Sequence, residues 1–235
     1  MTNHPKLEAA RENMIHRKPE GMSDKIAYAF VRLLRFVADT FFAGRYGNRA
    51  VVLETVAGVP GMVAGLLQHL TSLRYMREDG GWIRELLEEA ENERMHLMTF
   101  VQIVQPNLFE RIIVMITQAI FYNAYFWLYL FAPRTAHRII GYFEEEAVVS
   151  YTAYLAKIDA GEAENIPAPQ IAIAYWKLGE EARLRDVVIA VRADEAGHRD
   201  RNHYFADELE AGRVPQADIP EALKPIMSVV RKQAA

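Results

Sequence analysis

Two copies of the pattern Glu-x-x-His constrain this chain more than any other feature of its sequence. They lie at Glu93–His96 and Glu195–His198. Residues three positions apart share one face of an α-helix, so each pattern can direct a carboxylate and an imidazole at a common point. Helix bundles that bind two iron ions use this pattern twice, together with one glutamate from each of two further helices. The repeated pattern therefore predicts a metal-binding helical bundle.

Glutamates that could complete such a site occur before and between the two patterns. Glu54 precedes the first, and the run Glu144–Glu146 lies between them. A glutamate run is often a solvated turn of helix, but apolar residues border this one on both sides. Buried carboxylates are costly unless they are paired or bound to a metal, and iron accepts both carboxylate and imidazole ligands. The candidate ligands for two iron ions per chain are therefore Glu54, Glu93, His96, Glu144, Glu195 and His198.

Patterns typical of β-strands and hairpins are nearly absent, and helical spacing of apolar residues fills the chain. Glycine and proline mark the ends of the segments. The helices we expect are Asp24–Phe42, Arg49–Met76, Gly81–Gln105, Leu108–Phe131, Arg134–Asp159 and Gln170–Leu209, the last one broken once. The predicted fold is all-α, a ferritin-like four-helix bundle with a di-iron centre plus two membrane-interface helices. Residues 24–210 would form this domain, between an N-terminal arm (1–23) and a C-terminal tail (211–235).

Two of the expected helices are unusually apolar. No charged side chain occurs from Ile112 to Pro133, a length close to the ~20 apolar residues that span a bilayer. In the helix at 24–42, the charged residues Lys25, Arg32, Arg35 and Asp39 share one narrow face. A helix on a water-soluble bundle shows the inverse proportion. Both helices could be buried centrally, or both could lie in a membrane interface with their apolar faces in lipid.

Membrane contact is the favoured interpretation, because four ligand-bearing helices already fill the interior. A true span at 112–133 would place those helices on opposite sides of the bilayer and break the site.

The net charge of −4 and the lack of a basic cluster argue against nucleic-acid binding. The chain has no cysteine, which excludes disulfides, thiolate metal sites and cysteine catalysis. The polar first 25 residues resemble no secretory signal and no transit peptide.

Four segments resemble the characteristic motifs of the alternative oxidases. They are LETVAGVPGMVAG (53–65), NERMHL (92–97), EEEAVVSYT (144–152) and RADEAGHR (192–199). The resemblance implies a membrane-bound, cyanide-resistant terminal oxidase of a respiratory chain. Such an enzyme couples ubiquinol oxidation to the reduction of O2 to water at a di-iron centre, without proton pumping. It also implies a monotopic homodimer on membrane lipid, with the dimer contact at His69–Met76. A di-iron hydroxylase of quinone biosynthesis and a ferritin-like iron-binding protein remain alternatives.

The resemblance also assigns roles to single residues. Among the glutamate run, Glu144 is the one that matches a ligand, and Tyr151 matches a tyrosine beside the centre that is implicated in oxygen chemistry. The quinol site would comprise Arg49, Leu53, Glu146 and Ser150, with Arg35 and Asp39 near its entrance. An outer network around the ligands would comprise Asn92, Asp194, Tyr175 and Trp176.

The chain departs from the family pattern at a few positions. Gly197 falls where many relatives have histidine, and Ser150 where threonine is common. The absence of cysteine implies that the regulatory thiol of the plant enzymes is missing. Together with the short N-terminus, this predicts a bacterial-type member on the cytoplasmic face of an inner membrane.

Overall fold

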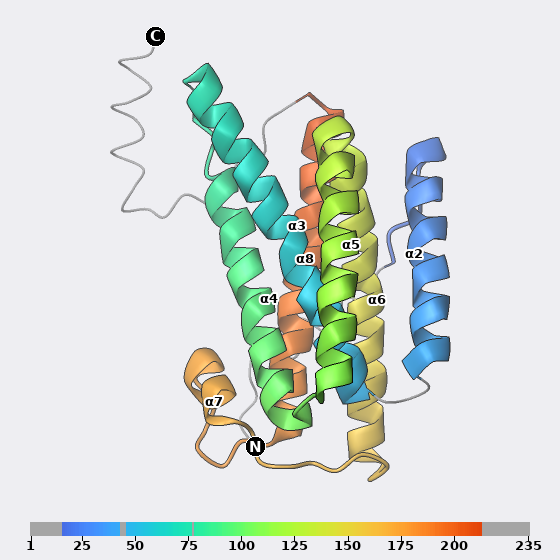
Figure 1. Ribbon diagram of the computed structural model, residues 1–235, viewed down its shortest axis with the longest axis vertical. Coiled ribbons are helices and arrows are strands. Elements are labelled where there is room, and N and C mark those ends of the chain that lie inside the picture. The colour runs from blue at the N-terminus through green and yellow to red at the C-terminus, as the bar shows by residue number, and fades with distance from the viewer. Residues whose placement is uncertain (1–15, 43–45, 77, 213–235) are drawn as a thin grey trace.

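The computed structural model describes residues 16–42, 46–76 and 78–212. Across these ranges the backbone is helical, and an isolated bridge between Pro167 and Arg183 is the only β pairing. The helices are α2 (Gly21–Phe42), α3 (Tyr46–Tyr75), α4 (Trp82–Val104), α5 (Leu108–Phe131), α6 (Pro133–Asp159), α7 (Gln170–Trp176) and α8 (Leu184–Glu210), as Figure 1 shows. The predicted all-α fold is confirmed.

Four long helices form the bundle. α3 packs along α4 and α6 along α8, while α5 lies against α3 and α6, and α2 lies against α6 (Figure 1). Gly61 lets α3 and α4 approach closely, since a Cβ atom there would lie 2.3 Å from the Leu86 carbonyl oxygen. The four helices predicted to carry metal ligands are thus the four that form the bundle.

Helix ends follow from local chemistry. α5 begins with a capping box, in which the Asn107 side chain accepts from the Glu110 amide (3.0 Å) and the Glu110 side chain accepts from the Asn107 amide (2.8 Å). Pro133 opens α6, a position that needs no amide donor.

The single break expected in 170–209 lies between α7 and α8. The predicted arm 1–23 ends inside α2, which begins at Gly21, and most of the predicted tail lies outside the described residues.

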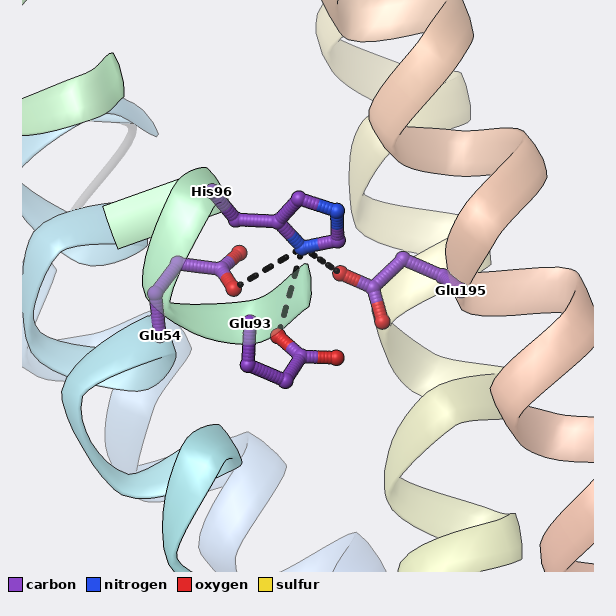
Figure 2. Close-up of side chains that lie close together, drawn as sticks. All are labelled: Glu54, Glu93, His96 and Glu195. Carbon is purple, nitrogen blue, oxygen red and sulfur yellow. Dashed lines mark hydrogen bonds and ion pairs between the residues drawn. The ribbon is translucent and has the colours of Figure 1, made fainter. Parts of the chain in front are cut away.

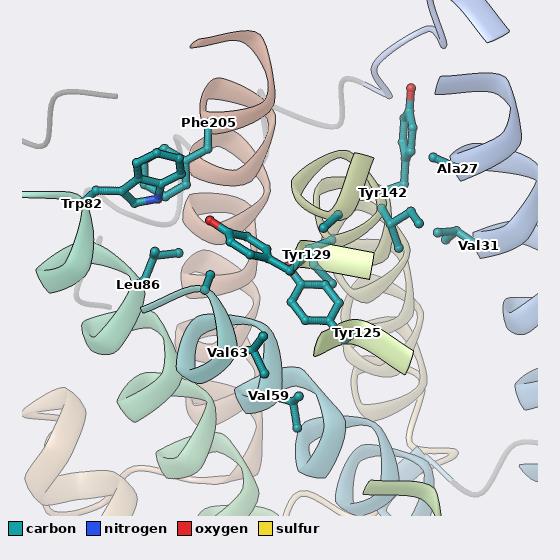
Figure 3. Packing of buried hydrophobic residues seen from close by; sticks show 14 residues of the cluster. Ala27, Val31, Val59, Val63, Trp82, Leu86, Tyr125, Tyr129, Tyr142 and Phe205 are labelled. Carbon is teal, nitrogen blue, oxygen red and sulfur yellow. The ribbon is translucent and has the colours of Figure 1, made fainter. Parts of the chain in front are cut away.

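The apolar core has two parts. One includes Trp82, Leu86 and Phe205 together with Tyr129 of α5 (Figure 3). The other includes Phe100 and the valines of the first turns of α8. On each of the four bundle helices, the candidate ligands fall between the residues of these two clusters. A dry apolar layer therefore lies on either side of the candidate site.

α2 and α5 carry large apolar side chains on their outer faces. α5 has only two fully buried residues, Tyr125 and Tyr129. Within the described residues, two helices are long and apolar enough to cross a membrane, Arg49–Tyr75 and Leu108–Phe131. The most apolar stretch of the first is 56% buried inside the protein, whereas that of the second is only 11% buried. Central burial of α2 and α5 is therefore wrong. The exposed apolar residues are Met22, Ile26, Phe30, Leu33, Phe36 and Val37 on α2, and Leu108, Phe109, Ile112, Met115, Ile116, Ile120, Tyr122, Trp127, Leu130 and Phe131 on α5.

The candidate metal centre and its surroundings

A cluster of carboxylates around one imidazole lies in the middle of the bundle (Figure 2). Glu54 comes from α3, Glu93 and His96 from α4, and Glu195 from α8, and one ligand atom from each lies within 4.8 Å of the others. The Nδ1 atom of His96 is 3.4 Å from Glu54 Oε2, 3.2 Å from Glu93 Oε2 and 3.3 Å from Glu195 Oε1. The spacing of residues along α4 and the pairing of α4 with α3 produce this convergence.

The other two predicted ligands border this cluster. His198 Nδ1 lies 2.6 Å from Glu93 Oε1 and 3.9 Å from Glu195 Oε2. The Glu144 side chain, from α6, lies close enough to Glu195 for the charge of Glu195 to raise the Glu144 pKa. The structure thus brings all six together, and none of them is more than 5% exposed.

The electrostatics of the cluster are those of like charges held in a dry site. Burial, together with the charge of Glu195, raises the pKa of Glu54 and of Glu144 well above the usual range. Although burial opposes ionisation of Glu93, the flanking imidazoles His96 and His198 hold its pKa well below the usual range. Burial also disfavours the His198 cation, but Glu93 and Glu195 outweigh it and raise the His198 pKa to about 10. Without a metal, Glu54, Glu144 and His198 therefore hold protons that offset the negative charge of the cluster, and bound cations would take the place of these protons.

The residues present fit metal ions. Among the described residues, the buried atoms Glu54 Oε2 and Glu195 Oε2 have no hydrogen-bond partner, and Glu93 Oε1 and His198 Nδ1 lie 2.6 Å apart without the alignment of a hydrogen bond. Such unsatisfied buried atoms are uncommon unless an ion or water completes them. Four carboxylates and two imidazoles also form the donor set of the di-iron carboxylate proteins.

Tyr151 lies at the edge of the cluster. It is buried on α6, and its hydroxyl donates a hydrogen bond to Glu54 Oε1. Its ring stacks on Phe100 at 5.8 Å between centroids. Burial, and then the nearby charge of Glu54, raise the pKa of Tyr151 well above its usual range, so the phenol stays protonated.

An outer network contacts His96 at Nε2, the ring nitrogen that faces away from the carboxylates. Asp194 Oδ2 lies 3.4 Å from His96 Nε2 and accepts hydrogen bonds from Trp176 Nε1 (2.7 Å) and Asn92 Nδ2 (3.1 Å). Asn92 also donates to the Tyr175 hydroxyl (2.9 Å). A carboxylate on the outer nitrogen fixes the tautomer and orientation of a ligating imidazole. Asp194 lies four residues before His198 on α8, yet its described contact is with His96 on α4.

Comparisons with known proteins agree with this arrangement. The family model described as alternative oxidase matches residues 4–207. The chain belongs to the alternative oxidase family. It is 58% identical over 220 residues to the mitochondrial ubiquinol oxidase of Batrachochytrium dendrobatidis, covering 92% of this chain and 69% of that protein. It is 54% identical over 211 residues to the mitochondrial ubiquinol oxidase 2 of Glycine max and to that of Arabidopsis thaliana, covering 90% of this chain but only 62% and 59% of those proteins.

The resemblance inferred from the four motifs is therefore confirmed. The chain matches about three fifths to two thirds of the length of these curated relatives. Their names place these alternative oxidases in mitochondria, so they give no support to the expectation of a bacterial-type member on a bacterial inner membrane.

The glutamate run that characterises one motif of the family points in three directions. Glu144 faces the cluster, whereas Glu145 accepts from the Arg17 amide (2.9 Å) and lies 2.9 Å from His203 Nε2. Glu146 faces α2, with Oε2 2.7 Å from Arg35 Nη1. Successive residues of a helix point about 100° apart, so only one of three can serve the centre.

The residues predicted for quinol binding in this alternative oxidase share one polar network where α2, α3 and α6 meet. Arg49 donates to Asp39 and to Ser150 Oγ (3.3 Å). Arg35 donates to Asp39 Oδ2 (2.9 Å); it also donates to the Glu146 side chain, and Ser150 donates to the Glu146 carbonyl (2.7 Å). Leu53 is half-buried on α3, directly before Glu54.

Several buried polar residues were not found from the sequence. His137 and His203, to which the sequence assigned no role, are both buried. Asp24 and Arg138 form a buried ion pair of 3.3 Å, and Asn202 links three helices. Their partners lie on other helices, so no spacing within the chain could have revealed them.

Proposed function

We propose that this protein is a ubiquinol:oxygen oxidoreductase that does not pump protons. Two ubiquinols supply four electrons and four protons, which reduce one O2 to two waters. The observation that carries the proposal is the buried cluster of four glutamates and two histidines with its unsatisfied ligand atoms. The names of the relatives, ubiquinol oxidases, support the choice of substrate.

In this proposal the six residues hold two iron ions per chain: Glu54, Glu93, His96, Glu144, Glu195 and His198. When bound, the irons supply the redox chemistry that reduces oxygen. The protein supplies ligation, orientation and a dry site, since the apolar clusters on both sides exclude water. Asp194, held by Asn92 and Trp176, keeps His96 oriented.

Tyr151 keeps a proton at its phenol oxygen next to Glu54, because burial and neighbouring carboxylates oppose its ionisation. We propose that it supplies a proton and an electron to the reacting oxygen. Its stacking on Phe100 fixes the ring and leaves the hydroxyl directed at the cluster.

Quinol would bind at the network of Arg49 and Ser150. The Arg49 guanidinium can donate to a quinol oxygen in place of its long 3.3 Å bond to Ser150. Asp39, Arg35 and Glu146 hold Arg49 and Ser150 in place, and Leu53 contributes apolar surface beside Glu54.

The exposed apolar faces of α2 and α5 would lie in one leaflet, and ubiquinol would reach its site from the lipid. The polar face of α2 is already taken by the bundle, since Arg32 and Arg35 both bind Glu146. A wide apolar face with its charges turned to the protein is typical of a monotopic membrane protein. The homodimer would form through His69–Met76, where Leu73 and Tyr75 are about two thirds exposed, at 65% and 64%.

The test is oxygen uptake by iron-loaded, detergent-purified protein given ubiquinol-1 and 18O2 in the presence of cyanide. Uptake should continue, with labelled water formed and ubiquinone as the sole organic product. Label inserted into the quinone ring would show a hydroxylase instead. Iron binding without quinol-driven uptake would leave a storage protein.

A further inference from the structure

A line of hydrogen bonds between buried side chains crosses the bundle. None of these side chains is hydrogen-bonded to the side chain of a residue that was assigned a role above. His137 Nδ1 is 2.8 Å from Asn202 Oδ1, and Asn202 Nδ2 donates to Glu89 Oε1 at 2.8 Å. At the other end, the Tyr129 hydroxyl is 3.2 Å from His137 Nε2. All four residues are at most 3% exposed. Polar groups this deeply buried usually have hydrogen-bond partners. Glu89 Oε1 has such a partner in Asn202, whereas Glu89 Oε2 has none and lies 4.0 Å from Arg201 Nη1.

The direction of these bonds follows from the Asn202 amide. Its nitrogen faces two acceptors, Glu89 Oε1 and the His198 carbonyl oxygen (3.1 Å), so its oxygen must face His137. His137 Nδ1 therefore carries the hydrogen, and His137 Nε2 accepts from Tyr129. Burial lowers the pKa of His137 to about 4, which agrees with a neutral ring. Each group donates to the next, and the line ends on the Glu89 carboxylate.

The line ends beside the metal cluster. Glu89 lies one turn before Glu93 on α4, and Asn202 lies one turn after His198 on α8. The bond between Asn202 and Glu89 therefore joins the two helices that carry the Glu-x-x-His patterns, just beyond the ligands. Through Tyr129, the same line is anchored on α5, the helix with the exposed apolar face (Figure 3).

We propose that Glu89 and Asn202 are positioning residues, whose hydrogen bond fixes the distance between α4 and α8 and so the spacing of the two metal positions. This inference rests on the proposed metal centre. Asn202 acts on His198 directly, through the carbonyl bond, and on Glu93 through Glu89 and the turn of α4. Glu89 acts here as a hydrogen-bond acceptor, and a neutral acceptor of the same shape should serve equally well.

The test compares Glu89→Gln with Glu89→Met. Glutamine keeps an acceptor oxygen for Asn202, whereas methionine fills a similar volume and accepts nothing useful. Metal-free protein is titrated with Mn²⁺, and electron paramagnetic resonance distinguishes a coupled pair of ions from isolated ones. Glu88→Met, on the exposed side of the same turn, is the matched control.

We expect the wild type, Glu89→Gln and Glu88→Met to bind a coupled pair with affinities within about twofold of one another. Glu89→Met should bind the second ion about tenfold or more weakly, as is typical when an outer partner of a metal site is lost. Equal damage from glutamine and methionine would overturn the proposal, as would a coupled pair of normal affinity in Glu89→Met. A wild type that binds no pair would instead refute the proposed metal centre.

Asn202→Leu keeps the test decisive if Glu89→Met does not fold, which circular dichroism would show. It removes the donor from the other side, so it should give the same loss of coupled pairs. Where both variants fold, the double variant should lose no more than Asn202→Leu alone, because Asn202→Leu already removes the shared hydrogen bond together with those to His137 and the His198 carbonyl. Losses that add would contradict a shared hydrogen bond.

Discussion

The helix pairs α2–α5 and α4–α8 reverse the usual placement of side chains in opposite ways. α2 and α5 expose phenylalanine, isoleucine and leucine and turn their few charges toward the protein. α4 exposes charged residues such as Arg84 and Glu91, as a soluble helix does, yet α4 and α8 bury glutamates and histidines in the centre. The exposed apolar side chains of α2 and α5 are unfavourable in contact with water. The buried ionisable side chains of α4 and α8 are unfavourable inside the bundle.

Each region is therefore incomplete without a different partner. Apolar surface of this extent is unfavourable in water, and contact with lipid would remove that free-energy cost. Buried carboxylates with unsatisfied oxygens also cost free energy, and bound cations would offset that cost. The comparison predicts that lipid contact and metal binding can be disrupted independently, although the polar network of α2, α3 and α6 lies between them.

The largest effect should follow loss of a central ligand. Glu195→Ala removes the carboxylate that contacts Glu144 and both histidines. We expect the protein to retain no stoichiometric iron, an affinity loss of at least about a hundredfold, which is the upper end seen for mere outer partners. Glu91→Ala, exposed on α4, is the control in iron analysis by mass spectrometry. Vesicle binding should be unchanged in both, and a loss of it in Glu195→Ala would contradict the independence of the two regions.

Tyr151→Phe should separate metal binding from turnover. The variant keeps the ring and its stacking on Phe100, so iron content should stay at the wild-type level. Turnover should fall about ten- to hundredfold, or about 1.4–2.7 kcal/mol in activation free energy, because the hydroxyl that is proposed to supply a proton and an electron is lost. Tyr154→Phe, on the same helix, controls for the loss of a buried hydroxyl. A fully active Tyr151→Phe protein would remove the tyrosine from the mechanism.

The lipid-facing region is tested by Phe36→Ser. Phe36 is 68% exposed on α2, and its transfer into lipid should contribute about 2 kcal/mol, or about thirtyfold in partitioning. Sedimentation with phospholipid vesicles measures this. Leu73→Ser, at 65% exposure on α3, is the matched control and should partition normally. Equal losses in the two variants would mean that the apolar faces are not specialised.

The smallest effect concerns the dimer, and it uses the same two variants in reverse. Leu73→Ser should weaken self-association about fivefold, from about 1 kcal/mol of lost apolar burial, as measured by analytical ultracentrifugation in detergent. Phe36→Ser should leave it unchanged. Weakening by Phe36→Ser alone would place the dimer contact on α2 instead.

What could be predicted from the sequence is what depends on spacing within one helix. The Glu-x-x-His patterns indicated four of the six candidate ligands, and the apolar stretch of 112–133 indicated the exposed α5, because spacing and composition alone determine them. The choice of Glu144 within its glutamate run rested on the family resemblance. The Asp194–His96 and Asn202–Glu89 contacts were missed, because they depend on how two helices align with each other. Asp24 was also missed, since its partner Arg138 lies on α6, far along the chain.

The most direct test of the account is an anaerobic titration of metal-free protein with Fe²⁺, followed by Mössbauer spectroscopy after exposure to air. The account predicts two irons bound per chain, and oxidised irons that are magnetically coupled, because the six ligands surround a single cluster. One iron per chain, or two that are uncoupled, would contradict the assignment of these residues to a di-iron centre.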